Sequence, residues 1–304
     1  MWNSYSINFL FKNYQIFDKL ITVQKGGENF LKKAVTMFVL IITMCIVNST
    51  NIKAATLTDE EYAKLKVFFS DMRISVMSDE EAKKYLNSDL DSAEAISKYY
   101  KVTPTNNGTM TTEVSKEEAE NAFDDARQNR ATFHDTSYKN IQIMRSTMGK
   151  NKYIVNLMTR WLVIPKIKSF DVIAMRTEDA TVEDGSQFGT QAYKTSMNGS
   201  TDIVSYSPYG TNIVKKANGY GISMNLVNDG VYFECDTQAD IFANTKYAEV
   251  YGSYQHATKN VTLEQSQAYN ISHNGYGEVL NFTPSIEPYY DEMKGVSIPL
   301  PYTP

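Results

Sequence analysis

Five acidic residues fall on or beside stretches that the alternation of apolar and polar side chains predicts to be β-strands: Asp171, Glu178, Glu234, Asp236 and Glu249. Two carboxylates brought together by a fold are sufficient for glycoside hydrolysis, because one donates a proton while the other acts as base or nucleophile. The sequence does not select a pair among the five. A carboxylate-dependent, glycan-active enzyme is therefore an alternative function, and whether the chain is an enzyme stays open.

Histidine and cysteine are scarce, with three His and two Cys in 304 residues. Cys235, His256 and His273 are a conceivable zinc set, since a zinc site takes three or four ligands with a carboxylate or thiolate among them, but surface or hydrogen-bonded histidines are the favoured alternative. Cys235 has no cation or histidine beside it in the sequence, which predicts a buried strand residue rather than a nucleophile. We expect no metal site and no cofactor, and the catalytic residues, if there are any, are unknown.

A short sequence echo marks two tyrosines as candidate ligand-binding residues. NGYGISMNL and NGYGEVLNF place Tyr220 and Tyr276 in equivalent positions before apolar strands. Aromatic rings stack on sugars, so a pair of such loops suits glycan recognition. The structural alternative, which the sequence favours, is that Asn-Gly supplies a positive φ at Gly219 and Gly275 and begins a strand.

The segment 31–54, LKKAVTMFVLIITMCIVNSTNIKA, has the two lysines, the apolar run and the small residues of a secretory signal peptide. Residues 1–30 contain the run KGGE, which AAA-GGA-GGA-GAA, a string that contains a ribosome-binding sequence, would encode. We therefore expect a start at Leu31 and treat 1–30 as a mis-annotated upstream extension; the alternative is a genuine long n-region. Cleavage after Ala54 or Ala55 predicts a secreted, extracellular protein. The apolar run is shorter than the ~20 residues of a spanning helix, so we expect no membrane span after cleavage.

The charge excludes one class of partner. Residues 1–55 hold six Lys and two acidic residues, which leaves 24 Lys and Arg against 33 Asp and Glu, a net charge of −9, in the remainder. No basic patch is apparent, and we expect no nucleic-acid partner. One cysteine beyond the signal peptide leaves no intramolecular disulfide, so an apolar core must supply the stability.

The segment 55–132 predicts a small helical region. Thr58 with Glu61, and Ser78 with Glu81, are capping-box spacings followed by apolar residues at helical intervals. Ser92 predicts a third short helix through Tyr99. A hairpin or linker follows Pro104, and a further amphipathic helix runs to about residue 131.

The segment 133–304 predicts a β-domain, because short alternating runs recur about every ten residues between turns rich in Gly, Asn and Asp. The fold class is therefore α+β: a small N-terminal helical region followed by an antiparallel β-sandwich, jelly-roll-like in strand number. Trp161 lies in one of the alternating runs and is expected in the core.

The segments KSFDVIAMR, NGYGISMNLV, SYQHA and the Gly-Val-Ser near the C-terminus resemble a group of uncharacterised secreted proteins of Gram-positive Firmicutes. The resemblance implies a Gram-positive, extracellular setting, and it implies neither an activity nor a site residue. With the residues themselves, it favours a secreted protein that binds or interacts at the cell exterior, with a cell-surface glycan or protein as partner. A secreted toxin component is a weaker alternative, since 109–114 is the only stretch with the Ser/Thr-rich alternation of a pore-forming hairpin.

Overall fold

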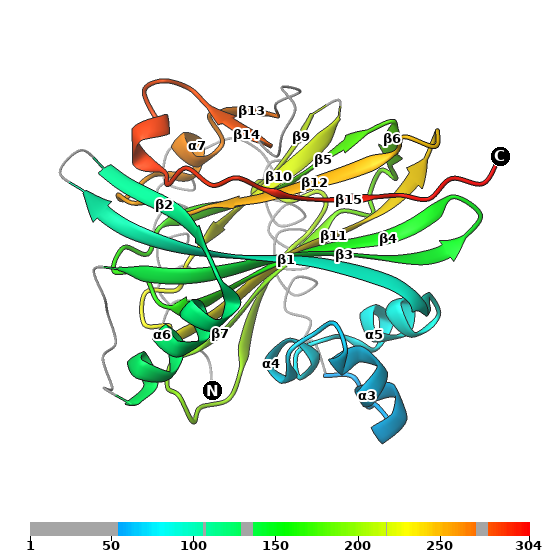
Figure 1. Ribbon diagram of the computed structural model, residues 1–304, viewed down its shortest axis with the longest axis horizontal. Helices are drawn as coiled ribbons and strands as arrows, with labels where there is room; N and C mark the ends of the chain where they lie inside the picture. Colours follow the sequence, from blue (N-terminus) through cyan, green and yellow to red (C-terminus); the bar gives the residue numbers. More distant parts are fainter. Residues whose placement is uncertain (1–53, 106–107, 129–135, 217, 272–278) are drawn as a thin grey trace, which may run out of the picture. The chain divides into compact units, whose positions relative to one another are not determined.

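The computed structural model describes residues 54–105, 108–128, 136–216, 218–271 and 279–304 (Figure 1). The upstream extension, the signal peptide up to residue 53, His273, Gly275 and Tyr276 lie outside the described residues, so the expectations about them stay predictions. Residues Lys53–Pro304 form one compact unit. None of the helices in the described ranges combines the length and the apolar character needed to cross a membrane.

The first helices begin where the capping residues predict. Helix α3 spans Asp59–Lys66, and the Thr58 side chain accepts a hydrogen bond from the Glu61 N–H while Glu61 bonds back to Thr58. Helix α4 spans Asp71–Ile74, and α5 spans Asp79–Leu86 with Ser78 as its N-cap. Helix α6 spans Lys116–Gln128, α7 spans Leu263–Ser266, and a 3₁₀ turn covers Glu287–Tyr289.

The prediction of a helix from Ser92 to Tyr99 was wrong, because these residues belong to strand β1, Asp89–Thr105. Ser92 donates its N–H and its hydroxyl to Asp89, three residues before it, instead of accepting from an N–H ahead as a capping serine would, and these bonds fall at a β-bulge between residues 89 and 94. Strand β1 then pairs with β2, Gly108–Val114, on one side and with β3, Ser137–Gly149, on the other. Two ladders of long-range hydrogen bonds outweigh a local helix signal, and they join the region 55–132 to the same sheet as the region 133–304.

Two antiparallel sheets confirm the α+β, sandwich-type fold class. The large sheet has the order β2-β1-β3-β4-β11-β7-β8, with β6 paired to β11. Its remaining strands are β4 Lys152–Val163, β6 Ala180–Val182, β7 Phe188–Lys194, β8 Asp202–Tyr206 and β11 Tyr232–Ala243.

The small sheet has the order β15-β12-β5-β10-β9. Its strands are β5 Phe170–Glu178, β9 Ile213–Lys216, β10 Gly219–Asn225, β12 Glu249–Gln255 and β15 Val296–Pro299. A separate hairpin of β13, Tyr269–Ile271, and β14, Leu280–Phe282, packs with Val172 and Ala174 of β5 in a second apolar cluster.

The apolar faces of the two sheets form the main core. Trp161 is 1% exposed at its centre, which confirms the prediction that it is buried. Its indole N–H donates to the Tyr254 hydroxyl at 3.1 Å, so the polar edge of this large side chain is satisfied inside the core.

Helices α4 and α5 attach to the opposite, outer face of the large sheet through a row of polar contacts. Because side chains alternate along a strand, every second residue of β11 points to this face. Four such residues each bond to a helical residue: Glu234 to Ser70, Asp236 to Arg73, Gln238 to Tyr85, and Asp240 to Lys84. Helix α6 lies on the same side of the sheet (Figure 1).

Candidate functional site

Three of the five carboxylates that the sequence singled out are buried structural groups. Asp171 is fully buried and accepts hydrogen bonds from the Tyr254 hydroxyl, from His256 Nδ1 at 3.0 Å and from the Ala257 N–H at 2.9 Å. Glu234 and Asp236 are equally buried, and each is paired with an arginine. Their partners already occupy the oxygens that a catalytic carboxylate would present to a substrate.

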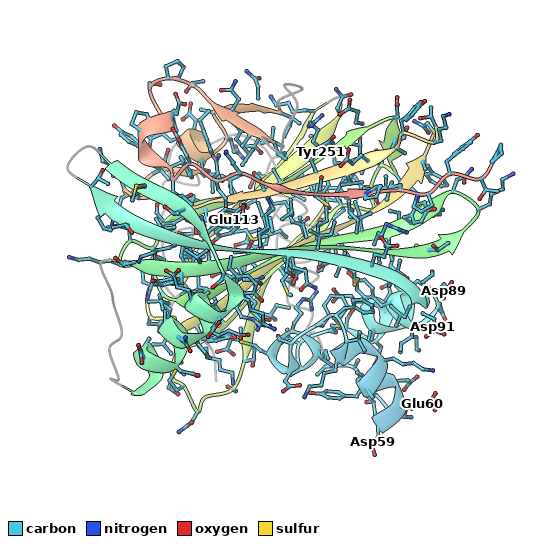
Figure 2. All side chains as sticks on the ribbon, in the orientation of Figure 1. Asp59, Glu60, Asp89, Asp91, Glu113 and Tyr251 are labelled. Atoms are coloured by element: carbon cyan, nitrogen blue, oxygen red, sulfur yellow. The ribbon has the colours of Figure 1, made fainter. Side chains whose placement is uncertain are left out.

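Glu178 and Glu249 are the pair that the fold brings together, since they stand directly opposite each other in the β5–β12 ladder. Arg176 Nη1 donates to Glu178 at 3.3 Å, and the Tyr251 hydroxyl donates to Glu249 at 2.6 Å (Tyr251 is labelled in Figure 2). Burial, the hydrogen bond to Glu249 and the charges of both glutamates raise the pKa of Tyr251 to about 12. The sheet therefore holds two acids side by side on its outer face.

The structure places Tyr220 in the core rather than on a loop surface. It is 1% exposed, and its hydroxyl bonds to Thr237 Oγ1 at 2.8 Å and donates to the Gln238 carbonyl at 3.1 Å. Burial, which dominates, raises its pKa well above the usual tyrosine range. In this arrangement the Tyr220 ring is not presented to a ligand.

The expected positive φ at Gly219 was wrong. Positive-φ glycines among the described residues are Gly108, Gly149 and Gly185, and Gly219 is not one of them. Glycine is required there for a different reason: a Cβ at this position would lie 2.1 Å from the Met175 carbonyl oxygen on the neighbouring strand. The Asn-Gly pair precedes a strand, as expected, but it serves close strand packing.

Cys235 and His256 are both buried. Burial raises the pKa of the Cys235 thiol well above its ordinary value, with the carboxylates of Asp171 and Asp236 adding to the effect, so the thiol stays protonated. His256 is held by Asp171 and packs edge-on against Trp161 at 5.0 Å between ring centroids. Within the described ranges no three His, Cys, Asp or Glu side chains gather as a metal site would require.

A candidate site among the described residues is a groove on the outer face of the large sheet, between helices α3 and α4 and Tyr232 of β11. It comprises a hollow of about 590 Å³ and an adjoining one of about 200 Å³, which share Lys66, Phe69, Ser70 and Arg160. The hollows cross strands β1, β3, β4, β11 and β7, whose contributions include Tyr99, Asn140, Met158, Arg160, Tyr232 and Lys194. Phe123 of α6 packs against Tyr232 at 6.5 Å between ring centroids.

We name the two hollows together the cationic groove, because three cations, Lys66, Arg160 and Lys194, are among their lining residues. Arg160 Nε donates to Glu234 at 2.7 Å. Burial, the largest single effect, opposes the charge of Arg160, but Glu234, Tyr232 and Tyr99 together outweigh burial and raise the pKa of Arg160. Lys66 pairs with Asp71 at 2.9 Å, and Lys194 makes no ion pair with a described residue. The Ser70 hydroxyl also donates to Glu234, so one buried carboxylate anchors both the groove's arginine and the start of α4.

Sequence reasoning missed these residues. Lys66, Arg160 and Lys194 are separated by 94 and 34 positions and belong to no motif, so their convergence depends on strand order and helix placement. The alternation that predicts β4 does identify Arg160 as outward-facing, but β7, which carries Lys194, was not predicted from the sequence, and alternation does not show which residues face the same groove.

Comparison with known proteins finds no matching family model, no matching curated protein and no matching solved structure.

Proposed function

We propose that this chain is an exported protein that binds an anionic glycan of the cell exterior in the cationic groove. The observation that carries the proposal is the gathering of three cations, Lys66, Arg160 and Lys194, around one hollow whose lining holds a single carboxylate, Asp71, in a chain whose net charge is −5. Most of such a surface repels anions, so a local cluster of cations concentrates an anionic ligand at one place.

The form of the groove supports an extended ligand. Its lining crosses five strands of the sheet, so a chain lying along it contacts Tyr99 at one end and Lys194 at the other. Tyr232, which is partly exposed, adds aromatic surface beside the cations, and sugar rings pack on such surfaces while their acidic groups face the cations. From this lining we expect a preference for acidic over neutral polymers.

Lys194→Glu tests the proposal, because Lys194 lines the groove without an ion-pair partner among the described residues. We measure binding to immobilised polygalacturonate, to a phosphodiester-linked glycan and to a neutral glucan. The parent should bind one or both acidic polymers and not the glucan, more weakly as salt rises. The charge reversal should weaken binding roughly tenfold, since exposed ionic contacts contribute up to about 1 kcal/mol each and a reversal adds repulsion.

Lys246→Glu is the matched control, because it makes the same charge change at an exposed residue outside the groove. Equal losses of polymer binding in the two variants would show that only the net charge of the protein matters, and would contradict a site in the groove. Binding of an acidic peptide such as polyglutamate, with no binding of either acidic glycan, would contradict the glycan as ligand.

Export has its own support in the signal-like segment 31–54 and its own measurement. N-terminal sequencing of the protein released by a Gram-positive host should begin at Ala55 or Thr56. Retention of residues 31–54 in the released or cell-bound product would contradict cleavage.

A glycan-active enzyme is the second candidate, favoured by the placement of Glu178 opposite Glu249. Directly opposed residues have Cβ atoms about 4.5–5.5 Å apart, and the carboxyl groups of retaining glycosidases lie about 5–5.5 Å apart. Release of new reducing ends from polygalacturonate by the parent, abolished in both Glu178→Gln and Glu249→Gln, would support it. Binding without any release supports the binding protein instead.

A further inference from the structure

Lys139 and Asp291 form an ion pair in the interior that neither proposed function uses. Among the described residues, Lys139 is the only lysine that is buried, and both side chains of the pair are completely shielded from solvent. Lys139 lies on β3, and Asp291 lies 152 positions later, between the 3₁₀ turn and β15. Lys139 Nζ is 2.5 Å from Asp291 Oδ2. The fold therefore holds an amine against a carboxyl group from a distant segment of the chain.

Aromatic rings enclose the amine. Lys139 Nζ lies 5.4 Å from the Trp161 ring centroid and 5.3 Å from the Tyr254 ring centroid, and both rings are buried. An ammonium has three N–H donors, but among the described residues Nζ has two oxygen acceptors, Asp291 Oδ2 and, at 3.5 Å, the Tyr254 carbonyl. Removing two charges from water is costly even when they are paired, so such surroundings favour a neutral arrangement of the same groups.

The second oxygen of Asp291 is held by the backbone. Oδ1 accepts the His256 N–H at 2.6 Å, and the Asp291 N–H donates to the His256 carbonyl at 2.9 Å. An N–H directed at a carboxyl oxygen stabilises the negative charge that develops there when a nucleophile attacks the carbon. With both groups fixed in contact, attack by the amine has the large rate advantage of an intramolecular reaction.

We propose that Lys139 and Asp291 condense to an intramolecular amide bond, which makes this pair a site of covalent self-modification. One proton passes from the Lys139 ammonium to Asp291 Oδ2, and the nitrogen lone pair then forms a bond to Cγ. The Cγ–Oδ2 bond breaks, and Oδ2 leaves as water with the proton it received and a second proton from the nitrogen. One ammonium and one carboxylate become one amide and one water, so no oxidant, reductant or further reactant is needed.

The amide suits these surroundings better than the ion pair does. It carries no charge, its oxygen is Oδ1 with the His256 N–H already in place, and its single N–H has the Tyr254 carbonyl as acceptor. The bond ties β3 to the segment before β15 and limits the unfolded chain as a disulfide would. The described cysteine, Cys235, is free, so the amide is a covalent restraint that this chain can make without a disulfide.

Peptide mapping by mass spectrometry of the purified full chain tests the proposal. Trypsin does not cleave after a lysine whose amine is part of an amide, so residues 131–145 should remain in one piece, joined to residues 260–294. The joined species should weigh the sum of the two peptides less one water, about 18 Da. Fragmentation should locate the bond between Lys139 and Asp291.

The chain contains a matched control pair. Lys215 Nζ and Asp184 Oδ1 are also 2.5 Å apart, but the Asp184 side chain is 82% exposed. Both groups stay hydrated and charged there, so trypsin should cleave after Lys215 and no water should be lost. Lys139→Arg keeps a cation beside Asp291 without an amine, and it should release residues 260–294 as a separate peptide of ordinary mass.

A double variant, Lys139→Met with Asp291→Leu, removes both charges and the bond together. Replacing a buried ion pair by apolar residues is often neutral or stabilising, so the double variant should fold. If the parent holds a covalent bond, the double variant should melt roughly 10 °C lower, because it lacks the restraint on a long loop. If the parent holds only an ion pair, the double variant should melt at the same temperature or higher.

Three results would overturn the proposal. The first is cleavage after Lys139 in the folded parent, with all peptides at their ordinary masses. The second is a loss of one water confined to residues 260–294, which indicates that an aspartate has closed a ring with its own backbone. The third is a melting temperature of the double variant equal to or above that of the parent.

Discussion

Arg73 is the residue whose replacement should lower the free energy of unfolding most through the loss of a single charge. Arg73 belongs to α4 and its side chain is fully buried. It binds both oxygens of Asp236 on β11 and also Glu81 on α5. Arg73→Met keeps much of the apolar stem but leaves two carboxylates in the interior without their cation. Removing one partner of a buried ion pair costs roughly 3–5 kcal/mol, a large fraction of the 5–15 kcal/mol that typically stabilises a domain.

The loss should depend on pH, and Glu81 sets its direction. Burial raises the pKa of Glu81, Arg73 opposes that rise, and Asp236 adds to it. A group with a raised folded-state pKa contributes fully below its unfolded-state pKa, near 4.5, and loses that contribution as pH rises through the folded-state pKa. Without Arg73 the pKa of Glu81 rises further, so the variant should lose more stability at pH 8 than at pH 5.

Urea unfolding followed by circular dichroism at both pH values measures the effect. Lys64→Met is the exposed control, since Lys64 pairs with Glu60 on the surface of α3 and its loss should change stability by less than about 0.5 kcal/mol. Replacing Arg73, Glu81 and Asp236 together with Met, Leu and Leu should recover most of the loss, because no buried charge is left unpaired. A loss below about 1 kcal/mol for Arg73→Met, or an equal loss at pH 5 and pH 8, would refute this reasoning.

Two further predictions concern the core. Trp161→Ala should cost about 3–5 kcal/mol in urea titration, because it empties a large space between the sheets; a loss below about 1 kcal/mol would show that the ring is dispensable there. Gly219→Ala should cost about 1–3 kcal/mol, since its Cβ meets the Met175 carbonyl at 2.1 Å, whereas Tyr220→Phe next to it should cost only about 1 kcal/mol for its hydrogen bonds. A larger loss for Tyr220→Phe than for Gly219→Ala would contradict this order.

Local patterns were sufficient wherever the determining contacts are close in sequence. Thr58 and Ser78 begin helices because their side chains bond to N–H groups three residues ahead. Alternation predicted β4, with Trp161 inside, and β11, with Cys235 inside, because a strand with one apolar face must turn it to the core. The α+β class with antiparallel sheets follows from the same two periodicities.

Only the tertiary structure decided the roles of the polar residues. Ser92 carries a helix signal but lies in β1, because pairing with β2 and β3 satisfies its strand over many residues. Glu234 and Asp236 look like candidate acids in the sequence, yet α4 covers them with Ser70 and Arg73. The partners of Glu234 and Asp236 lie more than 150 positions away, and the strands that pair with β1 lie on other segments of the chain, and periodicity encodes neither.

The same distinction between local pattern and tertiary contact applies to the residues of the proposed sites. The sequence determined that Lys139 and Arg160 lie on or beside strands, since local alternation sets which way a strand residue points, but it did not predict strand β7, which carries Lys194. It did not determine that Arg160 meets Lys66 and Lys194 across one groove, or that Lys139 meets Asp291 in the interior. Strand order, register and helix docking decide those neighbours, because a charged group's role depends on which groups stand within hydrogen-bonding distance of it.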